Sequence, residues 1–203
     1  MKKVALLILN HNIGMEYDNY TYSIMEKNLS FFSYEIISLK NKKCTKVNLI
    51  DSLTKLKTKL KSNDQLIFYY SGHTCWSPWR KGFIKFFDFK AYHVLYGGKQ
   101  NWVSNNYLMT FLEQIKCKKS LIFDTCCGPL IQLHNKKNTQ IITISDKLGK
   151  SKPIIENSRC IPAIAFYISK MVSSEEKYNS FSDYIKDNTQ KTYITFSGTE
   201  FIF

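Results

Sequence analysis

Short runs of apolar residues alternate along the chain with longer segments in which apolar residues recur every three or four positions. Runs of four to eight apolar residues are typical of buried strands, and the longer period is typical of amphipathic helices. This pattern predicts strands at 4–9, 34–39, 65–72, 120–124, 139–145 and 191–197. It predicts helices at 17–32, 48–61, 105–116, 161–172 and 181–187.

Strands that alternate with helices indicate an α/β fold, here a three-layer α/β/α sandwich with a mostly parallel central sheet. Residues 74–104 interrupt the alternation, because they are aromatic and punctuated by Gly and Pro. We expect an irregular segment with a small β-hairpin there, lying over one end of the sheet. No repeat, low-complexity tract or linker divides the sequence, so we expect residues 1–203 to form a single domain.

The amino-acid composition is ordinary except for its net charge, which bears on possible binding partners. The chain is 44% hydrophobic and 22% charged, as ordinary globular proteins are, but its net charge is +13. Such a charge would suit a protein that binds nucleic acid or an anionic surface. The lysines are dispersed among several segments, however, and no arginine-rich stripe appears. A solvated basic surface is the simpler interpretation, and the basic binder is kept as an alternative.

The sequence lacks the signals of a membrane-spanning protein, of a secreted protein and of a metal-binding protein. No apolar run approaches the roughly 18 residues that a membrane-spanning helix needs. The apolar start at 4–9 is short and no small-residue cleavage site follows it, so it does not resemble a signal peptide. The six cysteines show no metal-ligand spacing. We therefore expect a cytoplasmic protein with reduced cysteines, no metal and no cofactor.

Two of the predicted strands are followed by residues whose side chains are common in catalysis. The strand at 65–72 leads into His73, and the strand at 120–124 leads to Cys126. If the helix between them makes the usual crossover, the strands are parallel and their carboxyl ends meet at one edge of the sheet. An imidazole beside a thiol raises the thiolate fraction, which favours nucleophilic catalysis.

The same two stretches carry a family resemblance. The sequences YYSGHT and DTCCGP resemble the histidine and cysteine motifs of the caspase and metacaspase superfamily, and the order of strands and helices is similar over nearly the whole chain. The resemblance implies a cysteine endopeptidase in which Cys126 is the nucleophile and His73 the base. It also implies an oxyanion site formed by backbone N–H groups at Cys126 and near Gly72 and Thr74.

The resemblance further implies the kind of substrate. Asp124 stands where metacaspases carry the aspartate of a pocket for Arg or Lys before the scissile bond (position P1), and Ser71 lines the same pocket. The partner is then a protein or peptide substrate with a basic P1 residue. Thr74 replaces the family's usual glycine, and the acidic cluster that holds calcium in many metacaspases is missing. We therefore do not expect calcium dependence, and no activating ligand or partner can be read from the sequence.

Another class of function competes with catalysis. A catalytically inactive caspase-like module that binds partners would show the same fold, and the substitution at Thr74 favours it mildly. Cys127 falls at a variable position of the motif. The remaining histidines, His11, His93 and His134, lack a comparable context, and we expect surface or structural roles for them.

Overall fold

The chain forms a layered α/β structure. The computed structural model describes residues 1–10, 19–77, 90–93, 95–96, 99–125, 138–144, 154–156, 159–174, 180–188 and 194–198. No helix within these ranges combines the length and the apolar character that crossing a membrane requires.

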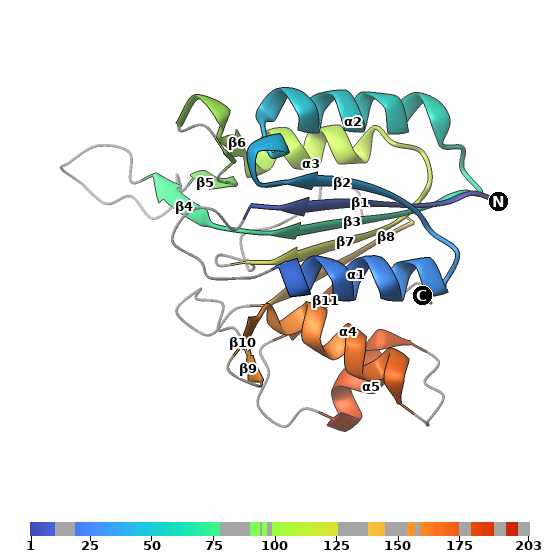
Figure 1. Ribbon diagram of the computed structural model, residues 1–203. Helices are drawn as coiled ribbons and strands as arrows, with labels where there is room; N and C mark the ends of the chain where they lie inside the picture. Colours follow the sequence, from blue (N-terminus) through green and yellow to red (C-terminus); the bar gives the residue numbers. More distant parts are fainter. Residues whose placement is uncertain are drawn as a thin grey trace.

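The centre of the fold is a six-stranded sheet with the strand order β11-β8-β7-β3-β1-β2 (Figure 1). Its strands are β1 (Lys3–Leu9), β2 (Glu35–Lys40), β3 (Gln65–Ser71), β7 (Lys118–Asp124), β8 (Thr139–Ile144) and β11 (Ile194–Gly198). All neighbouring pairs are parallel except β11 with β8. The predicted mostly parallel sheet is thus confirmed.

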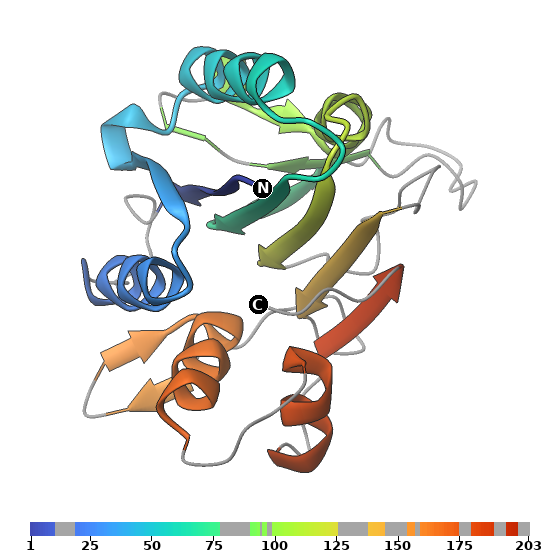
Figure 2. The ribbon, with the colours of Figure 1, turned by 90° about the vertical axis from the view of Figure 1, so that its right-hand side faces the viewer.

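Helices cover both faces of this sheet, as seen from two sides in Figures 1 and 2. Helices α2 (Lys46–Lys59) and α3 (Asn105–Glu113) lie on one face. Helices α1 (Asn19–Phe31), α4 (Ala163–Ser173) and α5 (Phe181–Asn188) lie on the other. Alternate residues of β1, β3 and β7 contribute to two separate apolar cores, one under each helical layer. The three-layer sandwich predicted from the sequence is confirmed.

Some predicted boundaries differ from the structure for local reasons. Helix α2 starts two residues before the predicted Asn48, because the hydroxyl of Thr45 accepts a hydrogen bond from the Asn48 N–H and caps the helix. Helix α4 starts at Ala163, after the N-cap residue Pro162. The preceding Ile161 belongs instead to a hairpin that we did not predict, formed by β9 (Ile154–Glu156) and β10 (Arg159–Ile161).

The segment between β3 and α3 forms a second sheet beyond the carboxyl end of β3. It contains β4 (Thr74–Ser77), β5 (Lys90–His93) and β6 (Val103–Ser104), paired antiparallel in that order. In Figure 1 strands β4 and β5 project from the end of the central sheet where β3 terminates. A short 3-10 helix, η2 (Lys99–Asn101), leads into β6. This small sheet therefore lies at the edge where we expected the catalytic residues.

Candidate active site

The candidate site is built on two adjacent parallel strands, β3 and β7. Their register places Ser71 opposite Asp124, the last residue of each strand. Because the strands end together, the residues that directly follow them, Gly72 and Thr125, lie at the same edge of the sheet. His73 lies two residues beyond Ser71, and Cys126 lies two residues beyond Asp124.

Hydrogen bonds join the two chain segments just beyond the strand ends. The Thr125 hydroxyl donates to the Gly72 carbonyl oxygen at 2.7 Å, and the hydroxyl oxygens of Thr125 and Thr74 are 3.3 Å apart. These contacts hold the residue before Cys126 beside the residues that flank His73, whose side chain is half-buried. Cys126 and Cys127 lie outside the described residues, so the roles of both stay predictions.

Tyr70 fixes the backbone of the candidate base. Its ring is buried, and its hydroxyl donates a 2.7 Å hydrogen bond to the carbonyl oxygen of His73. The bend at Gly72 allows this contact, because the chain turns back over the side chain of Tyr70. A methyl group on Gly72 would lie only 2.9 Å from the Tyr70 hydroxyl oxygen. Gly72 is therefore required by a close approach of atoms.

This close approach gives a first prediction. We expect Gly72→Ala to displace the rigid Tyr70 ring, weaken its hydrogen bond to His73, lower the stability by about 1–3 kcal/mol and reduce any activity that depends on His73. Urea unfolding would measure the loss of stability. Tyr70→Phe removes the clashing hydroxyl, so the alanine substitution should cost less in a Tyr70→Phe background than in the wild type. Equal costs in the two backgrounds would contradict this account.

His93 is structural, and it is buried more deeply than its sequence suggested. Its ring lies edge-on to Tyr70 at 4.8 Å and stacks on Phe123 at 5.4 Å, measured between ring centroids. Burial lowers its pKa to about 4, so the imidazole is neutral. Its Nε2 lies 3.4 Å from Asn105 Oδ1, while Nδ1 has no partner among the described residues. The ring of His93 thus packs strand β5 against the ends of both β3 and β7.

Asp124 performs a task that sequence reasoning missed. Its Oδ2 accepts hydrogen bonds from the Tyr69 hydroxyl and from the backbone N–H of Ala165, each at 3.1 Å. Ala165 lies in the first turn of α4, and the N-cap residue Pro162 supplies no capping side chain there. The carboxyl group of Asp124 therefore caps α4 from the neighbouring sheet. No local signal in the sequence links residues 41 positions apart.

The electrostatic state of Asp124 follows from its burial. The side chain is 3% exposed, and Oδ1 has no hydrogen-bond partner in the described part of the chain. Burial raises the pKa of Asp124 to about 7, although the backbone N–H groups of Ala165, Ile164 and Ala163 and the Tyr69 hydroxyl oppose the rise. The carboxyl group thus titrates near neutral pH, and a nearby cation would favour its charged form.

The two residues predicted to line the substrate pocket occupy one face of the sheet. Ser71 is fully buried and pairs with Asp124 in the register of β3 and β7. Both follow the alternation of Tyr69 and Ile122, which point toward α1 and α4. His93 packs on the opposite face, with Phe123. Within the described ranges, no three His, Cys, Asp or Glu side chains gather as metal ligands would.

Comparison with known proteins adds information on the fold. No protein-family model matches the sequence, and no curated protein matches it. Among solved structures, protein GSU0716 from Geobacter sulfurreducens is similar with a TM-score of 0.65 and 13% identity, over 98% of this chain and 94% of that one. The Drosophila initiator caspase Dronc is similar with a TM-score of 0.62 and 12% identity, over 96% of this chain and 78% of that one. The chain thus has an α/β fold similar to that of a caspase.

Proposed function

We propose that this protein is a cysteine endopeptidase whose catalytic pair is His73 and Cys126. The observation that carries the proposal is the register of β3 and β7, which brings the ends of the strands before the two residues to one edge of the sheet. The hydrogen bonds of Thr125 to Gly72 and Thr74 support it, because they join the flanking segments. The similarity of the fold to that of a caspase supports it further.

The proposed reaction proceeds through a thioester. The imidazole of His73 accepts the thiol proton of Cys126, and the sulfur attacks the carbonyl carbon before the scissile bond. Backbone N–H groups of Cys126, Gly72 and Thr74 are proposed to stabilise the negative oxygen of the tetrahedral intermediate. His73 then protonates the leaving amine, and water hydrolyses the thioester. The hydrogen bond from Tyr70 to the His73 carbonyl would keep the base in place throughout.

We further propose that the enzyme cleaves after Arg or Lys. Asp124 uses Oδ2 to cap α4, and its Oδ1 has no partner among the described residues. A guanidinium or ammonium group reaching Oδ1 would form a charge-assisted hydrogen bond and favour the ionised carboxylate. An aspartate at P1 would instead bring two buried like charges together, which is strongly unfavourable.

Cleavage of matched fluorogenic peptides tests the proposal. We expect peptides that differ only at P1 to be hydrolysed when that residue is Arg or Lys and to resist hydrolysis when it is Asp. The preference should amount to about a hundred-fold in kcat/KM, the size of one good charge-assisted contact. Turnover of the Asp peptide in preference to the Arg peptide would overturn the proposed pocket.

A catalytically inactive caspase-like module is the second candidate, favoured by Thr74 at a position where the family carries glycine. An acyloxymethyl ketone probe with a basic P1 residue separates the two candidates, because only an active enzyme would be labelled selectively at Cys126.

We further propose that the protein is cytoplasmic. The free, buried thiols of Cys44 and Cys117 support a reducing compartment.

A further inference from the structure

A pocket lies beyond the carboxyl end of strand β2, at the same edge of the sheet as His73. Its volume is about 540 Å³, within the range of pockets that hold small ligands. Among the described residues, its lining is unusually basic and includes Ser38, Lys40, Asn41, Lys42 and Lys43. Ligands of open α/β sheets bind beyond the carboxyl ends of the strands, so the position of the pocket is favourable for binding.

The turn that carries the lysines is held in one conformation. Residues Asn41–Lys43 form a 3-10 helix, η1, and Asn41 adopts a left-handed backbone conformation with φ of 48°. The buried thiol of Cys44 donates to the carbonyl oxygen of Leu39 at 2.8 Å and contacts that of Leu9 at 3.2 Å. Cys44 therefore ties the turn to the ends of β1 and β2. A fixed turn loses little conformational entropy when a ligand binds.

Among the described residues, the positive charge of the pocket is weakly compensated. Lys42 and Lys43 are exposed, and no ion pair is recorded for either within the described part of the chain. The Lys40 ammonium lies over the ring of Tyr22, and the carboxylate of Glu26 acts on it electrostatically. Burial nonetheless lowers the pKa of Lys40, so its charged form lacks full compensation. A bound anion would supply the missing negative charge.

Neutral hydrogen-bond donors complete the lining. The Tyr22 hydroxyl donates to Ser38 Oγ at 3.3 Å, and Ser38 itself lines the cavity. The Asn41 side-chain amide offers further donors. Helix α2 begins at Lys46, directly after the turn, so its positive end lies at the same edge. Ammonium groups, a hydroxyl and an amide around one cavity suit the several acceptor oxygens of a phosphate group.

From these features we infer that the pocket formed by Ser38, Lys40, Asn41, Lys42 and Lys43 is a binding site for a phosphate-bearing anion. Two or more phosphate groups match the charge of three lysines better than a single carboxylate does. The site is separate from the proposed P1 pocket, because it lies at the end of β2, whereas Ser71 and Asp124 end β3 and β7, and β1 lies between β2 and β3. Binding of such an anion does not depend on peptidase activity.

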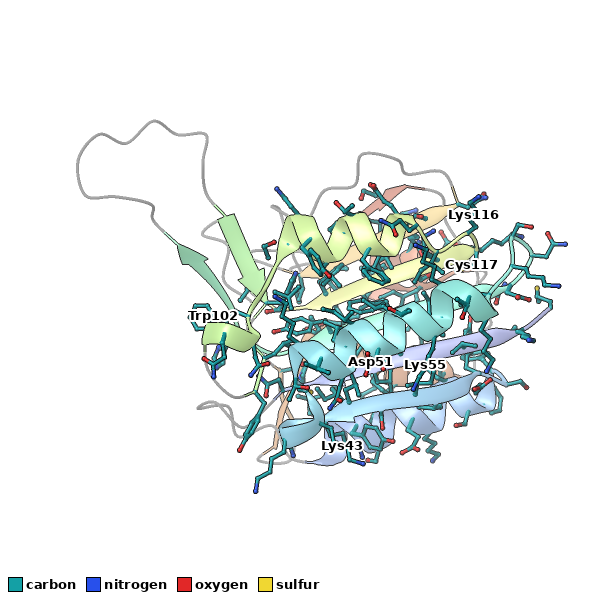
Figure 3. All side chains as sticks on the ribbon, turned by 90° about the horizontal axis from the view of Figure 1, so that it is seen from above. Lys43, Asp51, Lys55, Trp102, Lys116 and Cys117 are labelled. Carbon is teal, nitrogen blue, oxygen red and sulfur yellow. The ribbon has the colours of Figure 1, made fainter. Side chains whose placement is uncertain are left out.

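Calorimetric titration of the whole protein with inorganic tripolyphosphate tests this inference. We expect saturable binding with a stoichiometry of one, and a loss of affinity of about ten-fold or more in the variant Lys42→Gln/Lys43→Gln. The matched control is Lys55→Gln/Lys116→Gln, which removes the same charge from exposed lysines outside the pocket. Figure 3 shows Lys43 and Lys116 toward opposite ends of the molecule. The control variant should bind tripolyphosphate as the wild type does at constant ionic strength.

A second arm distinguishes a free ligand from a lipid headgroup. Vesicles that contain phosphorylated inositol lipids are compared with vesicles of phosphatidylcholine alone, using the same variants. Binding of either probe that depends on Lys42 and Lys43 but not on the control lysines supports the site. The inference is overturned if neither probe binds, or if both variants lose affinity equally, because the general field of a basic protein would then explain the binding.

Discussion

Replacement of Cys126 by Ala is expected to abolish peptide hydrolysis, and replacement of His73 by Ala to lower it nearly as far. Removal of the nucleophile or of its base should cost roughly a thousand-fold or more in kcat, because neither water nor a neighbouring side chain can take the place of the lost group. Turnover of an Arg-P1 peptide by each purified variant measures the effect. Both variants should remain folded, because each residue follows the end of a strand and its truncation should leave little cavity in either core.

Cys127→Ala is the matched control for this experiment. It removes the same thiol from the adjacent position, so it should retain activity close to that of the wild type. Urea unfolding of all three variants would separate lost chemistry from lost structure. If the Cys127 variant were inactive and the Cys126 variant active, the nucleophile would be one residue later than we propose. Wild-type protein without any turnover or probe labelling would favour the inactive module.

The sheet and its helices could be predicted from the sequence because burial dictates their patterns. Strand β3 is apolar almost throughout, since helices cover both of its faces, and α2 shows a stripe of leucines opposite its lysines. The parallel pairing of β3 with β7 followed from the crossover through α3. The positions of His73 and of the residue before Cys126 could then be inferred from topology alone.

The remaining features depend on contacts between distant segments. His93 is buried by the rings of Tyr70 from β3 and Phe123 from β7. The sequence around His93 does not indicate either neighbour. The basic pocket likewise depends on how Cys44 ties the turn after β2 to the end of β1. Local sequence patterns indicate burial and turns. They do not indicate which distant side chain caps a helix or packs against a buried ring.

Asp124 combines two tasks that substitution can separate. Asp124→Ala removes the acceptor of the Tyr69 hydroxyl bond and leaves the buried Ala165 N–H unsatisfied, and an unsatisfied buried donor costs about 1–3 kcal/mol. Asp124→Asn keeps an acceptor oxygen for both donors and removes only the charge. We therefore expect the alanine variant to be clearly destabilised at every pH and the asparagine variant to remain well folded.

The pH dependence of stability distinguishes the wild type from Asp124→Asn. Burial raises the pKa of Asp124 from 3.8 to about 7, so between these values the folded protein binds a proton that the unfolded chain has released. The contribution of this group to stability is complete below pH 3.8 and is lost as the pH rises toward 7. Relative to the wild type, Asp124→Asn should gain stability across this window, by up to a few kcal/mol. Parallel curves for the two proteins in urea unfolding would contradict the raised pKa.

The same variant tests the proposed specificity. Asp124→Asn should lose about ten- to a hundred-fold in kcat/KM toward Arg-P1 and Lys-P1 peptides, because a neutral amide cannot form the ion pair. In the wild type, the KM for an Arg peptide should fall as the pH rises through about 7 and the carboxylate ionises, whereas the variant should lack this titration. A variant that keeps the full Arg and Lys preference would show that Asp124 acts only as the cap of α4. The basic P1 residue would then have to be recognised by another group.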